Sequence, residues 1–124
     1  MYAKIMIGEK EVELAANAAT PFFYTAVFKK DLMKEQAPLF SGKSDPAESF
    51  GLVNELAFIM AMNAERSMDD MLKLTQDDYI GWLSGFEVFD LMSASQNILA
   101  VYLGNNKMLS KSKKEGGRQT GRTQ

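Results

Sequence analysis

The chain has 124 residues, 46% of them hydrophobic, which is enough for one domain with a modest core. It contains no cysteine and no histidine, so disulfides and thiolate chemistry are excluded, and the commonest general base and transition-metal ligand are missing. The net charge of −2 is divided unevenly, since the chain up to Gly104 has eight basic and 15 acidic residues whereas the remainder has six basic and one acidic.

Neither a secretory signal nor a membrane span is predicted. The first residues carry charges at Lys4, Glu9 and Lys10 and lack an uninterrupted apolar stretch. The most apolar helical segment ends at Glu65 and Arg66, short of the roughly 18 apolar residues that a membrane span needs. We therefore expect a soluble protein of the cytoplasm without a membrane partner.

Residues 3–14 alternate in the manner of a strand pair. The apolar residues lie on both sides of the Gly8-Glu9 pair: Ala3, Ile5, Ile7, Val12 and Leu14. Two such runs around a glycine-containing turn predict a β-hairpin. Because an isolated hairpin is only marginally stable in water, it is expected to pack on the helices that follow.

A first helix is predicted from Thr20 to about Glu35. Thr20 supplies a hydroxyl as N-cap acceptor, and Pro21 occupies the first helical position, where no hydrogen bond is lost. The segment 36–44, with a proline, a glycine and no apolar period, predicts a loop.

A second helix is predicted from Asp45 to about Arg66, and Glu48 is placed to complete a capping box at its start. Its apolar residues keep helical spacing over a broad face, so this helix is expected to be central and buried. The residues expected in the core are Phe50, Val53, Ala57 and Met60.

Two further helices follow. Thr75 begins a short one with two carboxylates in its first turn, where the helix dipole favours them. Its inner face is expected to contain Tyr79, Trp82, Leu83 and Phe86. A break over residues 85–90 separates it from a last helix over residues 91–103, which Gly104 ends as the residue after the C-cap.

These elements predict a mostly α protein of the α+β class, in which an N-terminal β-hairpin packs on a bundle of about four helices. The helical domain takes up residues 1–104, and residues 105–124 form a flexible basic tail. We expect this tail to be disordered, because it cannot bury enough apolar surface to offset its ordering entropy. It lacks interleaved aromatic residues and follows an acidic domain, so no nucleic-acid partner is predicted.

No catalytic, cofactor-binding or metal site is predicted. The Ser-Gly-Lys-Ser segment at 41–44 is similar to the end of a phosphate-binding loop, but Ala37 stands where that loop needs its first glycine. The paired aspartates at 69–70 and 77–78 lack the spacing of a calcium loop, and a helix N-terminus explains the second pair without a metal. No pair of acids has the pattern of a catalytic dyad in an apolar pocket, so an enzyme is not expected.

Methionines and aromatic residues are the candidates for binding a protein partner. Methionine has a flexible thioether that lets a surface repack around different partners, and exposed aromatic residues dominate interface energetics. The candidate partner-binding residues are Met60, Met68, Met71, Trp82, Phe86 and Phe89. The alternative at each position is a place in the core of a small helical protein.

Three parts of the chain carry a family resemblance. They are KIMIGEKEVEL followed by NAATPFFYTAVFKKDLMKE at the start, DDYIGWLSGFEVFDL in the middle, and ILAVYLGNN at the end of the helical domain. In these stretches the chain resembles the tail assembly chaperones of siphophages and prophages of Gram-positive bacteria. The resemblance covers most of residues 3–105 and lies in the overall pattern, since none of it is a catalytic motif.

The resemblance implies a non-enzymatic homo-oligomer of the host bacterial cytoplasm. Such a chaperone binds the tape measure protein, keeps it soluble, helps recruit the tail tube protein, and is absent from the mature virion. In many members a programmed ribosomal frameshift near the end of the reading frame makes a longer product. Lys113 and Lys114 lie where the slippery codons would fall.

Two other functions stay open at this point. One is a structural tail or head-tail connector subunit, and the other is a small regulatory protein that binds DNA through the basic tail. A helix-turn-helix with a basic recognition helix is not visible, since residues 75–103 contain no lysine or arginine.

Overall fold

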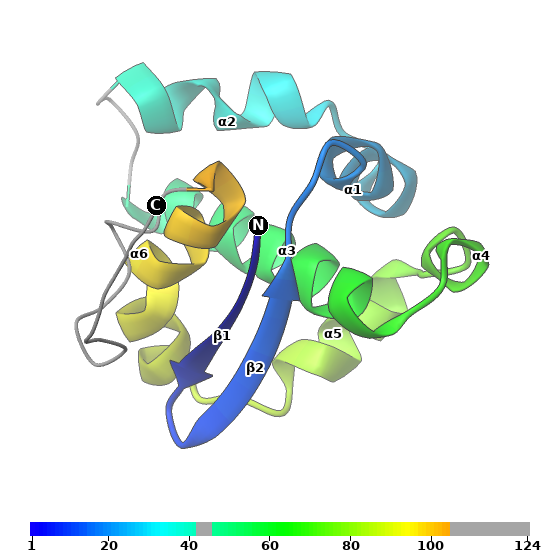
Figure 1. Ribbon diagram of the computed structural model, residues 1–124. Helices are drawn as coiled ribbons and strands as arrows, with labels where there is room; N and C mark the ends of the chain where they lie inside the picture. The colour runs from blue at the N-terminus through cyan, green and yellow to red at the C-terminus, as the bar shows by residue number, and fades with distance from the viewer. Residues whose placement is uncertain (42–45, 105–124) are drawn as a thin grey trace, which may run out of the picture.

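The computed structural model describes residues 1–41 and 46–104, which form an N-terminal β-hairpin and a set of helices (Figure 1). In chain order the elements are β1 (Tyr2–Ile7), β2 (Lys10–Ala15), α1 (Thr20–Phe28), α2 (Leu32–Ser41), α3 (Pro46–Glu65), α4 (Met68–Met71), α5 (Gln76–Leu83) and α6 (Val88–Leu103). The predicted fold class is confirmed, with six helices in these residues instead of about four. The expected cap at Asp45 and the expected disorder of residues 105–124 lie outside the described residues.

The hairpin has the predicted turn at Gly8-Glu9. Strands β1 and β2 pair antiparallel, with Ile7 opposite Lys10 across the two turn residues. Gly8 has a φ of 64°, which a type II′ turn requires at its first position and which glycine adopts without steric cost. The alternating residues of β1 and Leu14 of β2 are buried on the face that meets the helices.

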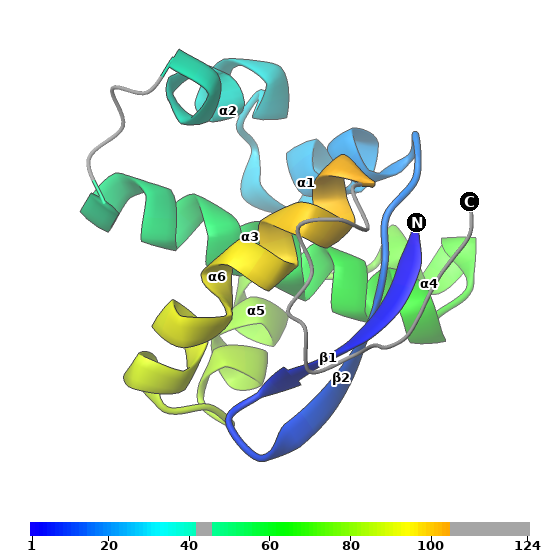
Figure 2. The same cartoon turned by 60° about the vertical axis from the view of Figure 1, so that its left-hand side comes forward.

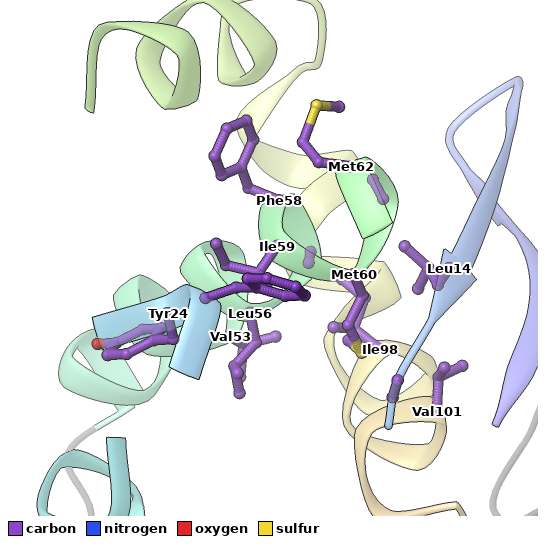
Figure 3. Packing of buried hydrophobic residues seen from close by; sticks show 14 of the residues in the cluster. Leu14, Tyr24, Val53, Leu56, Phe58, Ile59, Met60, Met62, Ile98 and Val101 are labelled. Carbon is purple, nitrogen blue, oxygen red and sulfur yellow. The ribbon is translucent and has the colours of Figure 1, made fainter. Parts of the chain in front are cut away.

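Helix α3 is the centre of the fold, as predicted. It packs against β2 and α6 on one side and against α1 on another, and the shorter helices contact it as well (Figure 2). Val53, Ala57 and Met60 are buried, and Phe50 is half-buried against the core. In Figure 3, Leu14 from β2 and Ile98 from α6 lie on one side of α3, and Tyr24 from α1 lies on the other.

The start of α1 differs in detail from the prediction. The N-cap residue is Ala19, and Thr20 is the first helical residue. The Thr20 hydroxyl oxygen accepts a hydrogen bond from the backbone N–H of Asn17 at 3.0 Å, while the Asn17 side-chain oxygen accepts one from Ala19 N–H at 2.8 Å. These bonds close the turn that precedes the helix instead of capping its first N–H groups.

The prediction of one helix from Thr20 to Glu35 is wrong, because α1 ends at Phe28 and a second helix, α2, begins at Leu32. Lys29 adopts a left-handed conformation with a φ of 59°, and its N–H donates to the Thr25 carbonyl at 2.9 Å, which ends α1. The Asp31 carboxylate then accepts from the N–H of Met33 at 3.0 Å and starts a new helix.

The loop predicted over residues 36–44 is helical as far as Ser41, because α2 continues through Pro38. A proline inside a helix costs about 3 kcal/mol in isolation, so tertiary contacts must offset it here. Leu32 is buried at the start of α2, and the Tyr102 hydroxyl of α6 donates a hydrogen bond to the Gln36 side chain. These contacts tie both the start and the middle of α2 to the rest of the fold.

The later helices begin at side-chain caps. Ser67 caps the short helix α4, which sequence reasoning missed. Thr75 and Asp78 form a full capping box at the start of α5, where the two carboxylates were expected. Helix α6 begins at Val88, three residues before the predicted start, and Gly104 ends it in the left-handed conformation as predicted.

The hairpin turn contacts the junction between α5 and α6. Gly8 lies against Asp90 in the first turn of α6, so closely that an added Cβ would be 2.3 Å from a carboxylate oxygen. The Lys10 ammonium donates a hydrogen bond to the Gly85 carbonyl and lies 5.0 Å from the centre of the Phe86 ring, a cation–π contact. The turn therefore fixes where α6 starts.

We predict that Gly8→Ala lowers the free energy of unfolding by about 1–3 kcal/mol, because alanine is strained at this backbone conformation and its Cβ meets Asp90. The matched control is Gly51→Ala in α3, where an added Cβ meets no atom within 4 Å. The control is expected to raise stability by about 0.5–1 kcal/mol, because alanine favours a helix interior. Urea unfolding measures both changes, and an equal effect of the two substitutions would contradict the contact.

Candidate partner-binding surface

Two of the six candidate residues are in the core. Met60 is 0% exposed and Met71 is 1% exposed. Met60 faces inward from the central helix, and Met71 is the one buried residue of α4. A partner cannot reach either thioether without opening the core, so their assignment to a partner-binding surface is corrected to a packing role.

Trp82 and Phe86 are half-buried members of a chain of aromatic rings. The chain links α1, α3 and α5 through neighbouring ring centroids between 4.8 and 6.4 Å apart; its members are Tyr24, Phe28, Phe58, Tyr79, Trp82 and Phe86. Edge and tilted ring pairs at this spacing are attractive beyond the area they bury. Much of the surface of the Trp82 and Phe86 side chains therefore packs against other residues of the fold and is not open to a partner.

Met68 and Phe89 are on the surface. Met68 is 67% exposed on α4, and Phe89 is 75% exposed in the first turn of α6. Figures 1 and 2 place α4 and the start of α6 on opposite sides of the molecule. The two residues therefore belong to separate surfaces.

The surface around Phe89 is an apolar stripe along α6 that sequence reasoning missed. We define the α6 stripe by residues spaced alternately three and four apart, which share one side of the helix: Phe89, Met92, Gln96, Leu99 and Leu103. All of them are exposed except Leu99, which is half-buried. The buried face of α6, with Leu91 and Ile98 among its residues, packs on α3 and β1 instead.

A signal for this stripe was present in the sequence. Residues 91–104 contain no charged side chain, although they form most of a helix with one face in solvent. Interface centres are depleted of charge, and contiguous exposed apolar surface on a protein usually marks an interaction site. The stripe was not recognised because the outward side of a helix is known only once its packed side is known.

The surface around Met68 is smaller. Leu72, directly after α4 and four residues from Met68, is also largely exposed, and we call these two residues the α4 pair. They lie beside the exposed carboxylates of Asp69 and Asp70. Helix α4 has only four residues, so its exposed methionine sits on a segment with little helical stability of its own.

A cluster of polar contacts around the Glu55 carboxylate has a structural role. The Tyr24 hydroxyl donates to a Glu55 carboxylate oxygen at 2.7 Å, and the Lys30 ammonium binds the same carboxylate at 3.1 and 3.2 Å. Burial, followed by the hydrogen bond to Glu55, raises the pKa of Tyr24 far above its usual value. Burial and the Glu55 charge raise the pKa of Tyr79 to about 12. The cluster joins α1 to α3.

Metal-ligand clusters, membrane-spanning helices and similarity to known proteins are three further signs of function that a chain can carry. Within residues 1–41 and 46–104, no group of three or more acidic side chains comes together to hold a metal ion. In the same residues no helix has the length and apolar character to cross a membrane. No family model, curated protein or solved structure matches the chain.

The raised pKa of Tyr79 predicts that the folded protein loses stability at alkaline pH. Tyr79 keeps its proton in the folded protein to about pH 12, whereas an unfolded tyrosine ionises near pH 10. The neutral ring therefore stabilises the folded state below about pH 10, and this contribution is lost as the pH rises through about 12. We expect Tyr79→Phe to reduce the fall in the urea midpoint between about pH 10 and about pH 11.5, within this interval.

The control for this measurement is Tyr2→Phe, because Tyr2 is largely exposed and solvent screens its interactions. It is expected to leave the alkaline fall close to that of the parent. If Tyr79→Phe and the parent lose stability equally with pH, the buried environment assigned to this phenol is wrong.

Proposed function

We propose that this protein is a tail assembly chaperone of a siphophage or prophage of Gram-positive bacteria. In this proposal it binds and solubilises the tape measure protein in the host cytoplasm, helps recruit the tail tube protein, and leaves before the virion is complete. It acts by contact alone, with no chemical step.

The segments that carry the family resemblance support the proposal because they are parts of one packed unit. The first is the hairpin, the next forms α1 and the start of α2, and the last two form α5 and both ends of α6. The hairpin turn contacts the middle segment through Lys10 with Gly85, and through Gly8 with Asp90. The resemblance therefore involves residues that position one another in space.

The observation that carries the proposal is the amount of apolar surface that the fold leaves uncovered. Among the described residues, large apolar side chains are exposed on the hairpin and on every helix except α3. They are Tyr2, Met6, Phe22, Met33, Met68, Leu72, Ile80, Val88, Phe89, Met92 and Leu103. Contiguous apolar surface on a protein usually marks an interaction site, and among these residues the α4 pair and the α6 stripe are the ones that lie side by side. The client in this proposal is the tape measure protein, which is long, helical and apolar. A chaperone for it needs exposed apolar surface that binds many different apolar segments.

We assign the client-binding role to the α4 pair. Met68 is unbranched and polarizable, so it adapts to differing apolar surfaces, and the short helix that carries it can adjust at low cost. The neighbouring carboxylates of Asp69 and Asp70 keep the pair in water when no client is bound. The α6 stripe has regular helical spacing, which suits a partner of fixed geometry instead.

We predict that co-expression with this chain moves the tape measure protein of the same genome into the soluble fraction. Replacing Met68 and Leu72 together by lysine should remove most of this effect, because two charges then occupy the apolar contact. Both residues are exposed, so the variant should fold and melt close to the parent. The measurement is the soluble fraction of the tape measure protein on a gel, with co-purification as a second readout.

The matched control is Met33→Lys, which makes the same change at a methionine of α2 that is 61% exposed. It is expected to solubilise the client as the parent does. Equal client solubility with and without the chain, together with no co-purification, contradicts the chaperone proposal. Detection of the chain in purified particles by mass spectrometry would favour a structural tail subunit.

A further inference from the structure

We infer that the outer edge of β1 binds an extended segment of a different protein, which adds a third strand to the hairpin and places an acidic side chain opposite Lys4. The inference goes beyond the proposed function, because it concerns backbone pairing at the hairpin instead of client binding by the α4 pair. It rests on the hydrogen-bonding pattern of the hairpin and on the order of the side chains along β1.

The register of the hairpin leaves backbone groups of β1 pointing away from β2. In an antiparallel ladder, directly opposed residues alternate between hydrogen-bonded and non-bonded pairs, and the pair that closes a two-residue turn is a bonded one. The bond from the Ala16 N–H to the Met1 carbonyl, at 2.7 Å, keeps the same phase at the other end of the ladder. The N–H and C=O groups of Tyr2 and Met6 consequently face the outer edge of β1.

This edge is open in the described part of the chain. Figure 1 shows β2 on one side of β1 and no strand along its other side. Outside the ladder, no residue within 1–41 and 46–104 forms a hydrogen bond with the backbone of Tyr2 or Met6, and their side chains are 56% and 51% exposed. The edge of β2 differs, because the Asn63 side chain of α3 donates to the Ala15 carbonyl at 3.2 Å. Unpaired backbone groups along an exposed strand are a template for another strand.

The side chains along the edge define the chemistry of the partner. The outward-facing residues of β1 are apolar, basic and apolar in order: Tyr2, Lys4 and Met6. In antiparallel pairing, the residue of an added strand directly opposite each of them lies on the same face of the sheet. Apolar side chains opposite Tyr2 and Met6, and a carboxylate opposite Lys4, are favourable cross-strand pairs. The edge therefore fits a segment in which an acidic residue has an apolar residue two positions away on each side.

Lys4 disfavours the partners that the chain itself can supply. A second copy of β1 paired over its whole length places Lys4 opposite its own image, and like charges directly opposite each other destabilise a strand pair. The segment 105–124 has six basic residues and one acidic residue, so its charge has the wrong sign. A lysine on an edge strand is a common means of preventing such self-pairing. An acidic strand of another protein meets neither obstacle.

Hydrogen exchange of backbone amides tests the open edge in the isolated chain. The Ile5 amide lies within the ladder opposite Val12, whereas the Met6 amide faces outward. In a dilute sample the Met6 amide should exchange at least about tenfold faster than the Ile5 amide, because only the latter is protected by a hydrogen bond. A Met6 amide as slow as that of Ile5 overturns the inference, since the chain itself or a second copy then covers the edge.

The probe for the partner is the peptide Thr-Val-Thr-Glu-Thr-Val-Thr, acetylated and amidated so that glutamate is its only charge. Its valines and glutamate lie opposite Met6, Lys4 and Tyr2 in antiparallel pairing. At saturation it should slow the exchange of the Met6 amide at least about tenfold, because that N–H gains an acceptor. The same peptide with N-methylated valines lacks donors toward β1 and should give no protection. No protection by the unmodified peptide at millimolar concentration, or equal protection by both peptides, overturns the inference.

An exchange of charges tests the residue opposite Lys4. Replacement of the glutamate in the peptide by lysine should weaken binding to the parent chain by about two- to tenfold, because like charges then oppose each other across the strands. Lys4→Glu should reverse this preference. The matched control Lys34→Glu makes the same change at an exposed lysine of α2 and should keep the preference of the parent.

Both lysines are exposed, so the two variants should melt close to the parent. If Lys4→Glu and the parent prefer the same peptide, the proposed register is wrong and the inference is overturned. The measurements use peptides and the isolated chain, so their failure is independent of whether a tape measure protein binds.

Discussion

The packing of other elements on α3 is the interaction on which the rest of the structure depends. The helix is buried over most of its length, from Leu52 to Met62, and it receives β2, α6 and α1 on different sides. Burial of each large apolar side chain contributes about 1.5–3 kcal/mol, so this helix supplies a large share of the stabilising surface. Because the other helices pack around α3, each of them buries one face against it and leaves another face exposed to solvent. The uncovered faces are where a partner can bind.

The hairpin helps to determine which face of α6 is exposed to solvent. Its turn holds the α5–α6 junction through the Lys10 contacts with Gly85 and Phe86, and it receives Asp90 beside Gly8. With the start of α6 fixed in this way and its inner face on α3, Phe89, Met92 and Leu103 are exposed, whereas Leu99 packs partly against the core. The same fold leaves Met68 exposed on α4, a helix on the opposite side of the molecule from the start of α6 (Figure 1). One packing arrangement thus yields two separate apolar surfaces.

Much of the fold could be predicted because its signals are local. Period-two alternation around Gly8, helical spacing in α3, the cap at Thr75 and the glycine at 104 each act within a few residues. The break at Lys29 could not be predicted, since a left-handed lysine has no distinct sequence signal, and α2 passes through Pro38 because contacts from Leu32 and Gln36 hold it. The partner-binding residues were harder to predict than the fold, because the type of a residue does not tell whether it lies on the exposed or the buried side of its helix. Met60 and Met68 look alike in the sequence, yet the packing of α3 buries the first and exposes the second.

The central claim is that the exposed α4 pair binds the client while the core stays closed, and methionine-methyl NMR tests it in a single experiment. The side chains of Met92, Met68 and Met60 report on the α6 stripe, the α4 pair and the core, respectively. The account predicts that a soluble fragment of the tape measure protein shifts the Met68 methyl signal, and that the Met92 and Met60 signals stay where they are in that titration. A binding fragment that leaves Met68 unchanged, or a titration in which Met60 moves most, would contradict it.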